Sequence, residues 1–101
     1  MEYTVDLGAQ VGALTGDELL GDRLLTALEH DPRVAGAATL QDSETGVVSA
    51  RFCVQAVDAE QAWAVGAAAF RAALQEAGVQ GQPNLTEILV EEYHEEAAAA
   101  G

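Results

Sequence analysis

The chain has 101 residues, the size of one domain, and its 17 acidic and 4 basic side chains give a formal net charge of −13. Phosphate backbones and anionic membranes repel such a surface, and the four arginines are scattered along the chain, so we expect no direct binding to nucleic acid and none to membranes. No stretch reaches the roughly 18 continuous apolar residues of a membrane span, and the first residues lack the pattern of a signal peptide. A single cysteine excludes an internal disulfide. The sequence therefore predicts a cytoplasmic protein.

The first part of the chain predicts a strand followed by a helix. Residues 2–7 alternate between polar and apolar side chains, which is typical of a strand, and residues 8–14 either extend it or form a loop. Thr15 and Glu18 fit a capping box, and leucines at helical spacing follow them. We therefore expect a helix over residues 16–30, ended by the sequence His-Asp-Pro.

The middle of the chain predicts a β-hairpin. Residues 34–40 form a weak strand made mainly of Ala and Gly, and residues 47–57 form the strongest strand in the sequence. The polar sequence Asp-Ser-Glu-Thr-Gly between them is typical of a turn. This spacing makes the two strands antiparallel neighbours.

A second helix and a last strand complete the pattern. Asp58 and Gln61 fit a capping box, and the helix they begin is predicted to end at Gly78. Residues 85–92 are predicted to form the final strand. One side of the helix carries small residues that allow a close approach to a sheet: Ala62, Gly66, Ala69 and Ala73. Trp63 and Phe70 lie beside this stripe, and we expect them to be packing residues.

The predicted order β-α-β-β-α-β resembles the ferredoxin-like superfold over residues 2–92. The chain also resembles the small, acidic, Ala-rich proteins of actinobacteria. The resemblance implies an α+β fold, a four-stranded antiparallel sheet in the order 4-1-3-2 with both helices on one face. We expect residues 1–92 to form this single domain. Residues 93–101, an acidic and Ala-rich tail, are expected to be a short helix or disordered.

The other face of the sheet is predicted to be open and of mixed character. It combines charged, hydrogen-bonding and apolar side chains, a composition that suits contact with another protein. The residues that we assign to partner binding are Thr4, Asp6, Arg51, Cys53, Gln55, Glu87 and Leu89, and Thr39 and Val57 are expected on the same face. We therefore expect a non-enzymatic interaction or assembly module that binds a second copy or another protein through this face or an edge strand.

Two other functions stay open at this point. ACT-like regulatory domains share the topology and bind amino acids beside a Gly-containing turn, which Gly8 and Gly12 resemble in position. The acidity also fits an inhibitor that occupies a basic site on a nucleic-acid-handling protein. RNA-recognition domains share the topology too, but the outer face of the predicted strand 47–57 has no aromatic residue on which a base could stack.

The sequence offers little for catalysis or metal binding. Cys53 would need a neighbouring base or positive charge to become a nucleophile, and Arg51 is the one charged neighbour on its face. Glu91, His94 and Glu95 would share a side if the tail were helical and could then hold a cation. We expect a solvated tail instead, and we expect no cofactor, no metal site and no enzyme activity.

Overall fold

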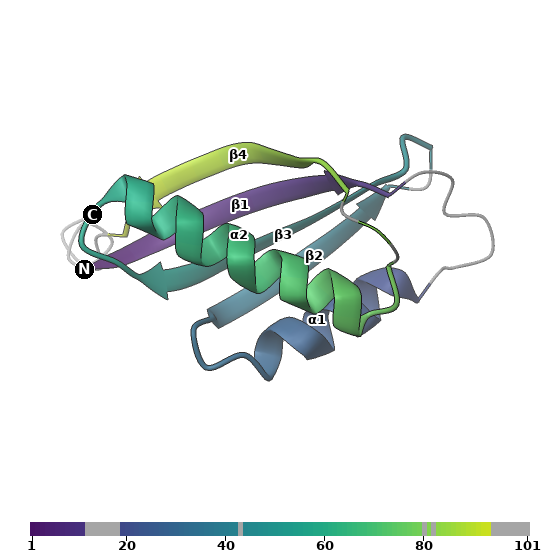
Figure 1. Cartoon of the computed structure of the whole chain (residues 1–101), viewed down its shortest axis with the longest axis horizontal. Helices are drawn as coiled ribbons and strands as arrows, with labels where there is room; N and C mark the ends of the chain where they lie inside the picture. The colour runs from purple at the N-terminus through teal and green to yellow at the C-terminus, as the bar shows by residue number, and fades with distance from the viewer. Residues whose placement is uncertain (12–18, 43, 80, 82, 94–101) are drawn as a thin grey trace, which may run out of the picture.

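The computed structural model of the chain describes residues 1–11, 19–42, 44–79, 81 and 83–93. Its elements, in chain order, are β1 (Glu2–Gln10), α1 (Leu20–Glu29), β2 (Ala35–Asp42), β3 (Val47–Gln55), α2 (Ala59–Glu76) and β4 (Leu85–Glu92). The strands form one antiparallel sheet in the order β2-β3-β1-β4, and both helices lie over the same face (Figure 1). The predicted α+β topology, sheet order and ferredoxin-like arrangement are confirmed. No helix of the described residues is long and apolar enough to cross a membrane.

The two central strands, β1 and β3, set the faces of the sheet. They pair without interruption from Glu2 opposite Gln55 to Gln10 opposite Val47. Side chains alternate along each strand, so the apolar half of both strands meets on one face. That half forms the centre of the core: Tyr3, Val5, Leu7 and Ala9 from β1, and Val48, Ala50, Phe52 and Val54 from β3. The polar residues between them consequently point away from the helices.

Helix α1 packs against β2 and α2, and its first turn is held by β2. The backbone N–H of Gly21 donates to Oε1 of Gln41 at 2.8 Å, and Oγ1 of Thr39 donates to the carbonyl oxygen of Gly21 at 3.0 Å. The residue before the helix, Leu19, makes no capping hydrogen bond with its side chain. A side chain of the neighbouring strand therefore satisfies one of the amides left free at the start of the helix. The expected capping box at Thr15–Glu18 lies outside the described residues.

Helix α2 begins as the sequence predicts. Asp58 accepts a hydrogen bond from the backbone N–H of Gln61 at 2.8 Å, and Oε1 of Gln61 accepts one from the backbone N–H of Val57 at 2.7 Å. The helix ends before Gly78, which has a φ of 100°. The capping interaction also explains a correction: β3 ends at Gln55, so Val57 belongs to the connection and not to the outer face of the strand.

Helix α2 packs against the core with its large aromatic residues and against the sheet with its small residues, as predicted. Phe70 is fully buried, and Trp63 is partly buried against the core. Gly66 lies over Val5 of β1, and a Cβ atom built on it would stand 2.9 Å from Cγ1 of Val5. Such a distance is shorter than a carbon–carbon contact allows, so the helix comes as close to the sheet as glycine permits. The same side of α2 is otherwise alanine: Ala62, Ala69 and Ala73 are all buried.

We predict that Gly66→Ala destabilises the protein. Replacing glycine in a helix interior normally adds up to about 1 kcal/mol of stability, whereas overpacking a core costs about 1–3 kcal/mol. Here the new methyl group meets a short branched side chain that is itself fully buried, so overpacking should dominate. Urea unfolding checks the sign. Gly66→Ala as stable as or more stable than the wild type would show that α2 is not held at this distance.

Candidate functional site

The face of the sheet opposite the helices is the candidate site, and we call it the open face. Outward-pointing residues of all four strands line it, and both described helices lie on the other side of the sheet. The strand registers place on it Glu2, Thr4, Asp6 and Gln10 of β1, Val47, Ser49, Arg51, Cys53 and Gln55 of β3, Ala35, Ala38, Leu40 and Asp42 of β2, and Thr86, Leu89 and Glu91 of β4. The side chain of Ile88 reaches the same face beside Gly8.

Six of the residues predicted for partner binding lie together on the open face: Thr4, Asp6, Arg51, Cys53, Gln55 and Leu89. The seventh, Glu87, was predicted wrongly. It stands opposite Leu7, whose side chain is in the core, and so takes the helix side at the edge of the sheet. The reason is a bulge: Leu7 pairs with Glu87 and Asp6 with Leu89, which leaves Ile88 as an extra residue and reverses the alternation along β4.

Thr39 is a second correction. Its hydroxyl donates to the carbonyl oxygen of Gly21 in α1, so its side chain lies on the helix side of β2. Ala38 and Leu40, opposite Arg51 and Ser49, are on the open face instead. The pairing of β2 with β3 is irregular between Ala35 and Ala38, where Gly36 has a φ of 62°. Because β2 consists mostly of small residues, its sequence does not alternate between polar and apolar side chains. The sequence therefore could not predict which side chains of β2 face the helices.

Cross-strand pairs join β1 and β3 along the middle of the open face. Nε and Nη2 of Arg51 lie 3.3 and 3.1 Å from Oδ2 of Asp6. Oγ1 of Thr4 lies 3.8 Å from Sγ of Cys53, and Nε2 of Gln55 donates to Oε2 of Glu2 at 3.4 Å. Each pair consists of directly opposite residues, so the polar centre of the face is internally matched and its one cation is beside an anion.

Exposed apolar side chains flank this polar centre on both edge strands. Leu40 on β2 is 70% exposed and Ile88 on β4 is 54% exposed. Neither was predicted for the site. Leu40 was the last residue of a predicted strand in which polar and apolar residues do not alternate. Ile88 reaches the open face only because of the bulge. Between Leu40 and Arg51 lies a shallow hollow of about 250 Å³, which is floored by the short side chains of Ala38 and Ser49. The protruding side chain of Leu40 and the adjacent hollow make the surface of the open face uneven.

The two edges of the sheet differ in charge. Residues 34–41, which contain nearly all of β2, include no ionisable side chain. Edge strand β4 carries Glu87, Glu91 and Glu92 and the bulge at Ile88. Charges and bulges are the usual means by which proteins prevent an edge strand from pairing with another chain. Edge β4 is therefore protected, while β2 is free of charge over the stretch from Ala38 to Gln41 that pairs regularly with β3.

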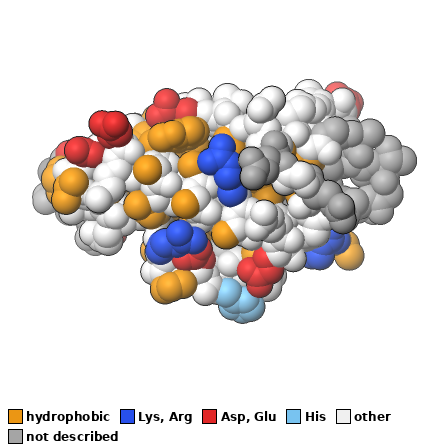
Figure 2. All heavy atoms as spheres, viewed as in Figure 1, with side chains coloured by type: hydrophobic (Ala, Val, Ile, Leu, Met, Phe, Trp, Pro, Cys, Tyr) orange, Lys and Arg blue, Asp and Glu red, His pale blue; other side chains and the backbone are white. Residues whose placement is uncertain are grey.

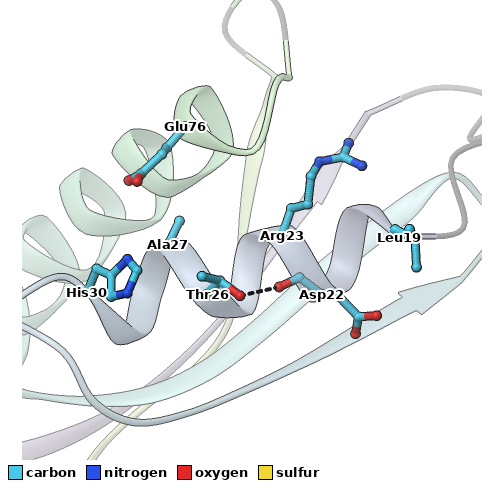
Figure 3. A pocket seen from close by; sticks show the side chains of 7 residues that line it. All are labelled: Leu19, Asp22, Arg23, Thr26, Ala27, His30 and Glu76. Carbon is cyan, nitrogen blue, oxygen red and sulfur yellow. Dashed lines mark hydrogen bonds between the residues drawn. The ribbon is translucent and has the colours of Figure 1, made fainter.

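The helix side of the molecule has its own groove. Figure 2 shows small apolar side chains and a few charged ones on this side. This groove has a volume of about 420 Å³. Figure 3 shows Asp22, Thr26 and His30 of the α1 region on one side of it and Glu76 of α2 on the other. Nε of Arg23 donates to the carbonyl oxygen of Ala77 at 2.9 Å and so ties α1 to the end of α2. The groove is wide, and we assign it no ligand.

Ionisation and metal chemistry do not single out another site. Bidentate hydrogen bonds from Arg33, at 3.0 and 2.7 Å, are the main reason that the pKa of Asp31 lies below its usual value, and the same contact raises the pKa of Arg33. This exposed pair orders the connection from α1 to β2. Among the described residues no group of His, Cys, Asp and Glu could hold a metal ion. His94 and Glu95, considered above with Glu91, lie outside them.

Of the two glycines that resemble an ACT-like turn, Gly8 is not found in a turn. Gly8 lies inside β1 and is buried; a Cβ on it would meet side-chain carbons of Ile88 and Val47, each at 3.5 Å. Gly12 lies outside the described residues. Comparisons of the chain with models of protein families, with curated proteins and with solved structures gave no match.

We predict that the Asp6–Arg51 pair contributes little to stability. The side chain of Arg51 is 62% exposed, and exposed ion pairs typically couple by about 0.2–1 kcal/mol. A double-mutant cycle with Asp6→Ala and Arg51→Ala, measured by urea unfolding, gives the coupling directly. A coupling above about 2 kcal/mol, the range of buried charged contacts, would contradict this description and would make the pair a structural element.

Proposed function

We propose that this domain is a non-catalytic protein–protein interaction module that binds through the open face and the adjoining β2 edge. The observation that carries the proposal is the sheet face itself. It has exposed apolar side chains, Leu40 and Ile88, at its two sides and a matched polar ladder between them. Protein interfaces commonly combine apolar contact with satisfied hydrogen bonds in this way, and an apolar patch left on a folded domain often marks a binding site.

The distribution of charge supports the same surface. The chain carries a net charge of −13, so most of its surface repels any acidic protein. On the open face the carboxylate of Asp6 is paired with the guanidinium of Arg51, and Leu40, Ala38 and Ser49 beside them are neutral. A partner that contacts this region meets little negative charge, since Asp6 is paired and Asp42 lies at the end of β2.

The chemistry of Cys53 supports binding rather than catalysis. A cysteine nucleophile needs a base or a positive charge that favours the thiolate. The side chain that faces Sγ of Cys53 is the hydroxyl of Thr4, at 3.8 Å, which cannot act as its base. Arg51, the cation next along the strand, is engaged by Asp6. We therefore treat Cys53 as a contact residue of the open face.

We predict that Arg51→Glu abolishes association with proteins and that Arg71→Glu does not. Both variants change the charge by the same amount, but Arg51 is on the open face and Arg71 is exposed on α2. Light scattering after gel filtration measures self-association, and capture from a native lysate measures other partners. Thermal unfolding must first show that both variants are folded.

A second open-face variant separates binding from disturbance of the Asp6 contact. Ser49→Arg fills the hollow between Leu40 and Arg51 without removing either member of the ion pair, and it should cause the same loss. If wild type, Arg51→Glu and Ser49→Arg all associate equally, the open face is not the binding surface and the proposal is refuted.

A further inference from the structure

We infer that the partner is a second copy of this chain, and that the two β2 strands pair antiparallel about a two-fold axis to form one continuous sheet. This inference rests on the proposed function and names its partner. Edge strand β2 begins at Ala35 and ends at Asp42, and among the described strands it is hydrogen-bonded to β3 alone. Its other side faces away from the sheet, where a further strand can add.

The charge of the chain selects this edge for contact between copies. Two chains of −13 repel each other, so a contact between like chains is favoured where the meeting surfaces carry little charge. Residues 34–41 meet that condition. The opposite edge does not, because pairing two copies of β4 would align Glu87, Glu91 and Glu92 with like charges, which is destabilising in a sheet.

The shape of β2 is complementary to itself. In a closed two-fold interface, residue i contacts residue j and residue j contacts residue i. With the axis at Thr39, each Leu40 lies opposite Ala38 of the other copy. The exposed leucine then contacts the short side chain of Ala38, which lies next to the hollow at Ser49. Both leucines, now 70% exposed, become covered at once.

The ends of the strand fit the same arrangement. About an axis at Thr39, Asp42 of one copy lies opposite Gly36 of the other, so the two aspartates stand at opposite ends of the paired segment. Gly36 has a φ of 62° and lies where the pairing with β3 is irregular. An irregularity at this point weakens further pairing, which keeps the contact short and leaves the two Asp42 side chains at its opposite ends, away from each other.

The test is sedimentation equilibrium of the untagged chain, with Leu40→Glu and a matched control, Val57→Glu. Both positions are exposed and apolar, but Val57 lies in the connection after β3 and outside the open face. Leu40→Glu places like charges near the axis and should raise the dissociation constant of the dimer at least about tenfold. Val57→Glu should leave it within about twofold. Leu40→Lys should also weaken the dimer, because a lysine on an edge opposes pairing whatever the charge of the chain.

Salt separates a second copy from a basic partner. Two acidic chains repel less when screened, so the dimer should tighten as the salt concentration rises from about 0.05 to 0.5 M. Binding to a basic protein would weaken over the same range.

The remaining outcomes each overturn the inference in a distinct way. A monomer at every concentration, with capture of another protein that Arg51→Glu abolishes, refutes the second copy and leaves the proposed function standing. A dimer weakened equally by Ile88→Glu refutes edge pairing in favour of stacked sheet faces. A dimer that tolerates Leu40→Glu and Arg51→Glu alike refutes both the edge pairing and the proposed function.

Discussion

The uninterrupted pairing of β1 with β3 is the constraint on which the rest of the structure depends. It aligns two alternating strands so that Val5, Leu7, Phe52 and Val54 meet on one face, where Gly66 of α2 packs against Val5. Two helices cover that face, and the described chain has no third layer for the other one. The open face is therefore a direct consequence of how the core is built, and its composition is free to serve contact with other molecules.

Charge then decides which part of this face can be used. A chain of −13 keeps most molecules of its own kind apart. On the open face Asp6 is paired with Arg51, and β2 has no ionisable side chain before Asp42, so the repulsion is locally weaker there. The acidity is thus more than a solubility property in this account. It makes the neutral edge selective, because association elsewhere on the surface meets unpaired carboxylates.

The fold could be predicted because its signals are local. Alternation in β1 and β3, the capping box at Asp58 and the glycine at position 78 each act within a few residues. The errors come from interactions between elements. The bulge at Ile88 moved Glu87 to the helix side, and the hydrogen bonds of Thr39 and Gln41 with Gly21 fixed which side chains of β2 face the helices. The most exposed apolar residue of the site, Leu40, depends on that orientation and so could not be found from the sequence.

Hydrogen–deuterium exchange at two protein concentrations tests the central claim most directly. Backbone amides of β2 should exchange more slowly at several hundred micromolar than at about 1 micromolar, because a second strand would satisfy the amides that now face away from the sheet. Those of β4, the other edge of the same sheet, should not change and serve as the internal control. Equal exchange of β2 at both concentrations would contradict the account, since the uncharged edge would then remain unpaired.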